Sequence, residues 1–218
     1  GCDPDKITVF NNVEPLSMLE PGDRPTITDG ELHLIYIGGI AEHRGLDTPV
    51  AAMPEILKRV PGARLTIIGD GFTLPALREQ AAALGLTEPQ VTFTGWMKFA
   101  DAMEITKTGT VGLVPHIRSP HTDATVPHKL FEYLSFGQPV IVSDCPPLAR
   151  IVREFDAGEV FVASDAASFA EAAERLSKAS RWRATSDNGK RAIRERYNLE
   201  HEGRTLAAMY GSLTGAGR

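Results

Sequence analysis

Apolar residues along this chain alternate between short continuous runs and longer stretches with one apolar face. The runs are typical of strands buried on both faces, and the stretches are typical of helices that cover a sheet. Strands are predicted at 32–37, 64–68, 91–94, 110–114, 139–142 and 159–162, and helices at 47–60, 74–84, 100–106, 127–134, 147–154 and from 166 onward. The alternation predicts an α/β fold, with a doubly wound, parallel, six-stranded Rossmann-like sheet and extra C-terminal helices.

The first 30 residues lack this alternation and are rich in turn formers. Within them, 7–10 is predicted as a short strand. Asp3 and Asp5 have the spacing of a metal-binding pair, but their turn-rich context favours a capping role. We interpret residues 1–30 as a segment that packs on another unit and is not part of the core.

The helix predicted to begin at Pro127 and to end before Gly137 is the most informative element. Proline suits the first helical position, and the N-terminus of a helix attracts anions. On a helical wheel the apolar side holds Leu130, Phe131 and Leu134, and the polar side holds His128, Lys129 and Glu132. The polar side offers two cations for an anion and a carboxylate for hydroxyl groups. A plain solvated face is the alternative.

Ligands of doubly wound sheets bind outside the carboxyl ends of the strands. The loops that follow the predicted strands are 38–46, 69–73, 95–98, 115–127 and 143–147. The 115–127 loop is the longest irregular one, and long loops in compact domains are usually functional. We therefore expect the site near this loop.

Composition limits the classes of function. The chain has 218 residues, a net charge of −5 and two cysteines. The negative charge argues against a nucleic-acid binder, and two cysteines fit a reducing cytoplasm. No apolar run approaches the roughly 18 residues that a membrane span needs. The basic stretch 178–197 is interpreted as a solvated helical face, with peripheral contact at the inner face of the membrane as the alternative.

Several common sites are absent from the sequence. The segment after the first strand does not match Gly-x-Gly-x-x-Gly, and no P-loop or Gly-x-Ser-x-Gly elbow occurs. The six histidines show no paired zinc spacing. The sequence thus contains none of these common cofactor-binding, catalytic or zinc-binding motifs.

The order of the remaining motifs is that of a known family. They are Tyr36-Ile37-Gly38-Gly39-Ile40, Arg44-Gly45-Leu46-Asp47, Ile67-Ile68-Gly69-Asp70-Gly71, Val91-Thr92-Phe93-Thr94-Gly95, Pro127-His128-Lys129-Leu130-Phe131-Glu132-Tyr133 and Gly137-Gln138-Pro139-Val140-Ile141-Val142-Ser143-Asp144. This succession resembles the C-terminal, donor-binding half of retaining glycosyltransferases of the GT-B fold, family 4 (glycosyl transferases group 1). The resemblance covers residues 5–214.

The resemblance implies roles for individual residues. Glu132 matches the second Glu of the family's Glu-x7-Glu pattern, which binds the nucleotide ribose, and Arg44 matches a cation that contacts the diphosphate. The nucleotide-sugar site that it implies consists of Gly38, Gly39, Arg44, Gly95, Trp96, His121, Thr125, Val126, His128, Lys129 and Glu132. Gly95 and Trp96 match the region beside the base.

The sequence departs from the family pattern twice. Ala124 occupies the position of the first Glu, which approaches the donor sugar, and Gly39 replaces a diphosphate-binding Arg. Asp123 or His121 is the hypothetical substitute near the sugar. The catalytic residues implied are thus Arg44, Lys129 and Asp123.

The resemblance also implies the organisation and activity of the protein. Residues 1–30 correspond to the interdomain linker, 31–197 to the nucleotide-sugar-binding domain, and 198–218 to a helix that returns toward a missing N-terminal acceptor domain. The resemblance implies that the full enzyme transfers a sugar from a nucleotide-diphosphate sugar with retention, and that it needs no metal and no bound cofactor. We expect this chain, which begins at Gly1 rather than Met, to be inactive alone. A non-catalytic nucleotide-binding module and a GT-B-type nucleotide-sugar epimerase are the alternatives.

Overall fold

The computed structural model describes residues 3, 6–19 and 27–214. Its centre is one six-stranded parallel sheet in the order β3-β2-β1-β4-β5-β6. The strands are β1 (His33–Ile37), β2 (Arg64–Ile68), β3 (Val91–Gly95), β4 (Val111–Val114), β5 (Val140–Ser143) and β6 (Gly158–Phe161). Every predicted strand from residue 31 onward is confirmed, and so is the doubly wound α/β fold. The winding direction reverses between β1 and β4.

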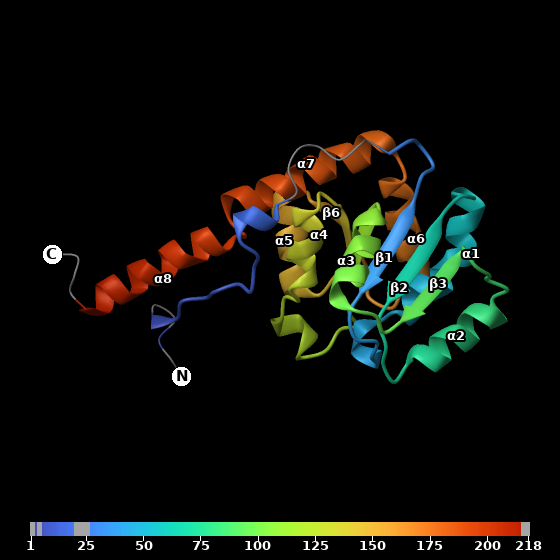
Figure 1. Ribbon diagram of the computed structural model, residues 1–218, viewed down its shortest axis with the longest axis horizontal. Coiled ribbons are helices and arrows are strands. Elements are labelled where there is room, and N and C mark those ends of the chain that lie inside the picture. The colour runs from blue at the N-terminus through green and yellow to red at the C-terminus, as the bar shows by residue number, and fades with distance from the viewer. Residues whose placement is uncertain (1–2, 4–5, 20–26, 215–218) are drawn as a thin grey trace.

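Helices cover both faces of the sheet (Figure 1). On one face a hydrophobic core joins the sheet to α1 (Asp47–Arg59), α2 (Leu74–Ala83) and α6 (Ala166–Leu176). On the other face a second core joins it to α3 (Phe99–Thr108), α4 (Lys129–Ser135), α5 (Pro146–Phe155) and α7 (Ala179–Glu195). Because both faces are covered, the strands are mostly apolar, which is why the sequence revealed them.

The position of α4 depends on one glycine of β4. A Cβ atom at Gly112 would lie 2.2 Å from Cγ of Tyr133, so only glycine lets this helix pack so closely on the strand. The Tyr133 hydroxyl, in turn, accepts a hydrogen bond of 3.0 Å from the backbone N–H of Ile37 at the end of β1. These two contacts fix α4 beside the carboxyl ends of β1 and β4.

The last helix leaves the body of the domain. Figure 1 shows α8 (Leu199–Thr214) extending away from the sheet with the N-terminal segment beside it. The two are joined by hydrogen bonds from the backbone N–H of Leu199 to the carbonyl of Glu14 (3.0 Å) and from Asn11 to the Glu202 carboxylate (2.7 Å). The predicted C-terminal helices are therefore present.

Two local predictions are wrong. Residues 7–10 form no strand, and the side chains of Ile7 and Val9 are exposed, because this segment lies away from the edges of the sheet. The helix predicted from Pro127 begins at Lys129, so Pro127 precedes it instead of occupying its first position. Asp5, of the Asp3/Asp5 pair, and residues 20–26 of the N-terminal segment lie outside the described residues.

Candidate functional site

A pocket opens at the carboxyl ends of β1 and β4, where the winding of the sheet reverses. Its volume is about 520 Å³. Its walls come from the loops after β1 and β4 and from the start of α4, and consist of Ile37, Gly38, Arg44, Phe99, His116, His121, Thr125, Val126, Pro127, His128, Lys129 and Glu132. Most of the residues predicted for the site thus lie together in one cavity.

Lys129 occupies the floor of this pocket. Its Nζ lies 3.7 Å from the ring centroid of Tyr36, in a cation–π contact. A Cβ atom at Gly38, where φ is +134°, would lie 2.7 Å from the same Nζ, so glycine leaves room for the ammonium group. Burial, aided by the Arg44 charge, holds the pKa of Lys129 well below its ordinary value, and only Glu132 acts in the opposite direction. The alternative of a plain solvated face therefore does not describe Lys129, which is only partly exposed.

Arg44 and Lys129 together form the cationic centre of the pocket. Arg44 ends a short 3₁₀ turn, Glu42–Arg44, and its Nη1 lies 3.0 Å from Nε2 of His116. His116 is 2% exposed, and burial together with the Arg44 charge lowers its pKa to about 3. The imidazole is therefore neutral and accepts the guanidinium hydrogen bond. Its Nδ1 is buried and has no hydrogen-bond partner among the described residues.

The cationic centre lacks acidic partners. Within the described part of the chain, neither Arg44 nor Lys129 forms an ion pair with a carboxylate. The backbone N–H groups of Thr125, Val126 and His128 likewise donate to no described acceptor. Free donors and half-buried positive charge in the same pocket can bind an anion with at least two oxygens.

Glu132 stands at the other end of the pocket. Its Oε1 lies 3.5 Å from Nδ1 of His128, and Nε2 of the same imidazole lies 2.9 Å from Oε1 of Glu14. Burial, together with the Glu14 carboxylate, raises the pKa of Glu132, and His128 opposes this rise. Ligand atoms of these three side chains lie within 4.8 Å of one another. Each nitrogen of His128 faces a carboxylate, so the imidazole lies between two acidic groups.

A second hollow of about 380 Å³ adjoins the pocket and shares Ile37, Gly38 and Phe99 with it. Gly39 and Trp96 line this second hollow, and the Trp96 side chain is 75% exposed. Gly95 lines neither cavity; its carbonyl accepts a hydrogen bond from the backbone N–H of Gly69.

Asp123 is not brought to either cavity. Its carboxylate forms a two-pronged ion pair with Arg118, with distances of 2.6 Å and 2.9 Å. The Arg118 guanidinium holds the pKa of Asp123 below its ordinary value. A role for Asp123 near a sugar would require this pair to open.

Sequence reasoning missed three residues of this region: Glu14, Phe99 and, as a partner of Arg44, His116. Glu14 comes from the N-terminal segment, and no local pattern connects it to a helix more than a hundred residues away. His116 was visible only as a histidine directly after a buried strand, at the edge where ligands bind.

The basic segment 178–197 is partly neutralised within the domain. Arg181 forms ion pairs with Asp156 and Glu159, Arg196 pairs with Glu154, and Lys190 is buried. Among the described residues, no helix is long and apolar enough to cross a membrane. Peripheral membrane contact stays a prediction.

Fold and site together define a doubly wound α/β domain with a cationic pocket where its winding reverses. A profile of the family described as "Glycosyl transferases group 1" matches residues 31–179, which is more than half of the chain. The chain therefore belongs to this family, as the motif order predicts.

Individual relatives agree with this placement. The chain is 28% identical over 185 residues to a D-inositol 3-phosphate glycosyltransferase from Nocardia farcinica, and the match covers 79% of this chain and 40% of the relative. The chain spans less than half the length of the curated relatives it matches.

Solved structures share the fold. One is Anabaena Alr3699/HepE in complex with UDP-glucose, with a TM-score of 0.74 and 15% identity, covering 94% of this chain and 57% of that chain. Another is the C-terminal domain of a glycosyl transferase group 1 family protein (LpcC) from Francisella tularensis, with a TM-score of 0.69 and 16% identity, covering 85% of this chain and 98% of that domain.

Proposed function

We propose that this chain is the donor-binding half of a retaining glycosyltransferase and that its central pocket binds a nucleotide-diphosphate sugar. The observation that supports this most directly is that Arg44 and the half-buried Lys129 line one pocket, and that neither forms an ion pair with a carboxylate among the described residues. Holding the Lys129 ammonium beside the Arg44 charge in a partly enclosed pocket without an anion is unfavourable, and a diphosphate would supply that anion.

The remaining walls fit the other parts of such a ligand. The Glu132 carboxylate is acceptor-only and suits the two vicinal hydroxyls of a ribose. Trp96 and Phe99 line the adjoining hollow and offer aromatic surface to a base. The HepE structure of the same fold contains UDP-glucose, which fits this placement.

The proposed chemistry follows from the charges. When the bond between the anomeric carbon and the diphosphate breaks, negative charge grows on the leaving group. Arg44 and Lys129 would then bind the transition state more tightly than the ground state. Helix α4 has only seven residues, so its dipole adds little beside these cations. For the sugar end we retain His121, which lines the pocket, and Asp123 as candidates.

The acceptor site is proposed to lie on another domain of a longer polypeptide. Leu206, Tyr210 and Leu213 of α8 are exposed, and so is Val9 of the neighbouring N-terminal segment. An apolar surface of this kind fits a second domain that closes over the pocket. We therefore expect the chain alone to bind the donor weakly and to transfer no sugar.

A thermal-shift panel of UDP-, GDP- and ADP-sugars tests the proposal. A ligand at a hundred times its Kd stabilises the folded chain by about 2.7 kcal/mol, so one base should raise the melting temperature selectively. Arg44→Ala and Glu132→Ala should abolish this rise and leave the unliganded melting temperature nearly unchanged. Glu104→Ala, on α3 and 79% exposed, is the matched control.

If no member of the panel raised the melting temperature at millimolar concentration, the donor-binding assignment would be rejected. A non-catalytic nucleotide-binding module is the second candidate, because Ala124 and Gly39 replace two polar family residues. Donor hydrolysis by the full-length polypeptide would favour the transferase, whereas binding without hydrolysis or transfer would favour the module.

A further inference from the structure

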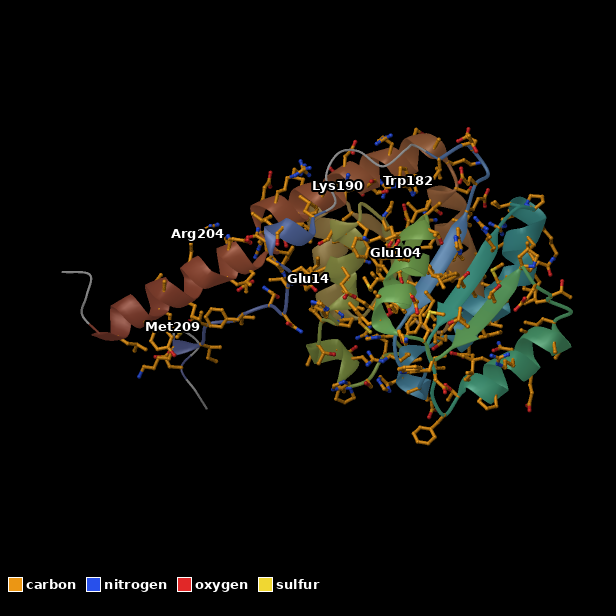
Figure 2. The ribbon with its side chains drawn as sticks, viewed as in Figure 1. Glu14, Glu104, Trp182, Lys190, Arg204 and Met209 are labelled. Atoms are coloured by element: carbon orange, nitrogen blue, oxygen red, sulfur yellow. The ribbon has the colours of Figure 1, made fainter. Side chains whose placement is uncertain are left out.

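Glu14 belongs to the N-terminal segment, yet its side chain reaches the helix that carries Glu132. Figure 2 shows Glu14 where this segment meets the body of the domain. The Glu14 carboxylate lies 2.9 Å from Nε2 of His128 and is only 22% exposed. It also lines, together with Glu132, an apolar hollow of about 470 Å³ beside the central pocket.

His128 connects the two carboxylates through its two ring nitrogens. Nε2 faces Glu14, and Nδ1 lies 3.5 Å from Oε1 of Glu132, whose side chain is 14% exposed. The two nitrogens therefore lie against two different carboxylates, and the imidazole connects them. Oε1 is the oxygen of Glu132 near His128, whereas Oε2 has no hydrogen-bond partner among the described residues, which leaves it for a ligand in the pocket.

The position of Glu14 is itself fixed from outside the sheet. Its carbonyl accepts the backbone N–H of Leu199 at 3.0 Å, and the backbone N–H of Leu16 donates to the Glu200 carboxylate at 3.0 Å. Both partners lie at the start of α8. The N-terminal segment is therefore held at a defined place before it meets His128.

We propose that Glu14 and His128 are positioning residues for ribose recognition: Glu14 orients the His128 imidazole, which in turn holds the Glu132 carboxylate toward the nucleotide. This inference rests on the proposed function of the pocket. It means that the segment outside the sheet domain contributes to nucleotide affinity without touching the nucleotide. A change in the path of this segment would then change the affinity for the donor.

A comparison of nucleotides with pyrophosphate tests the proposal. UDP, GDP, ADP and inorganic pyrophosphate are titrated calorimetrically into the wild-type chain and its variants. Pyrophosphate has the two phosphates but no ribose, so it does not depend on Glu132. Glu14→Ala should weaken binding of the preferred nucleoside diphosphate about threefold to tenfold, which is the weight of one hydrogen bond, and should leave pyrophosphate binding within about twofold.

Two further variants check whether Glu14 acts through His128. Glu14→Gln keeps an acceptor for the imidazole N–H and should restore part of the affinity. In a His128→Ala background, Glu14→Ala should have no additional effect, because the bridge is already removed. Glu104→Ala removes a carboxylate that lines the same apolar hollow without contacting His128, and should leave both affinities unchanged. Pyrophosphate binding also reports that each variant is folded.

Simple electrostatics predicts the opposite effect of Glu14→Ala on the nucleotide affinity, because removing a negative charge should tighten the binding of any anion. Tighter or unchanged nucleotide binding in Glu14→Ala would overturn the proposal, as would equal weakening of nucleotide and pyrophosphate. A rise in the melting temperature with MnCl₂ or ZnCl₂ alone, lost in Glu14→Ala, would overturn it in favour of a metal site. If the wild-type chain bound pyrophosphate and nucleotides equally weakly or not at all, the proposed function itself would fail.

Discussion

Two histidines are buried and uncharged in this domain, and their neutrality depends on contacts with distant residues. His33 on β1 is 5% exposed, with Nε2 at 2.9 Å from the Thr66 hydroxyl, and burial lowers its pKa to about 4. His116 is held at a pKa of about 3 by burial and by Arg44. Both therefore stay neutral where an unfolded histidine, with a pKa of about 6.5, takes up a proton.

These shifts predict an acid-sensitive fold. The unfolded chain binds more protons than the folded chain between about pH 4 and pH 6.5, so the free energy of unfolding should rise with pH across this window. For each histidine, the free energy of unfolding should be lower by roughly 2 kcal/mol at pH 5 than at pH 7.5. Urea unfolding at both pH values measures the loss, and His33→Asn, whose amide can replace the Nδ1–H donor, should reduce it by about half.

Lys129 and Glu14 mark the limit of sequence reasoning at this scale. The helical wheel places Lys129 on the polar face, which is correct for the helix but does not show Tyr36 of β1 lying beneath it. Glu14 and His128 are 114 residues apart in number, and nothing local to either one predicts their contact. Residue type and periodicity found the candidate ligands, whereas their charge states come from neighbours that the fold supplies.

At the scale of elements, α4 carries much of the pocket, and its placement depends on Gly112. A methyl group there would collide with the Tyr133 ring, so Gly112→Ala should lower the free energy of unfolding by about 3 kcal/mol. Because the helix must shift to relieve the collision, nucleotide binding should weaken as well. Chemical denaturation and the titration above measure both effects.

Gly62 provides the comparison for this variant. An added Cβ at Gly62 meets nothing within 4 Å, and its backbone is not in the left-handed region. Gly62→Ala should therefore change the stability by less than about 0.5 kcal/mol. If both variants had the same stability, the close packing of α4 on β4 would be disproved.

Strands were easier to predict than the ends of helices. A strand buried on both faces is apolar at every position, and this pattern is readable without knowing its neighbours. The 7–10 segment has strand-like residues but lies away from the sheet edges, so its composition misleads. Pro127 shows the other difficulty, since a proline can lie in the turn before a helix as well as in its first position.

At the scale of the whole molecule, α8 contributes little to the core. The contacts that anchor it involve Leu199, Glu200 and Glu202, all in its first turn, whereas Leu213 is 74% exposed. A chain that ends at Gly203 should therefore keep its melting temperature within about 2 °C and bind nucleotide as the complete chain does. A large loss of stability on this truncation would show that the outer half of α8 stabilises the domain.

The truncation also separates two roles of α8. If the outer half of the helix serves a second domain, as we propose, removing it should impair sugar transfer by the full-length polypeptide but not donor binding by this chain. Initial rates of transfer compared with titration of the donor measure the difference. An equal loss of sugar transfer and of donor binding would contradict the proposal that the outer half of α8 serves the second domain.

The sequence alone determined the order and type of the core elements, the doubly wound sheet and the family, because apolar periodicity and motif order are properties of the chain itself. It also identified Arg44, Lys129 and Glu132 as candidate ligands. Only the tertiary structure decided that Lys129 lies half-buried against Tyr36, that Asp123 pairs with Arg118, and that Glu14 reaches Glu132 through His128. Those facts depend on burial and on contacts between distant segments, which come into being only when the chain folds.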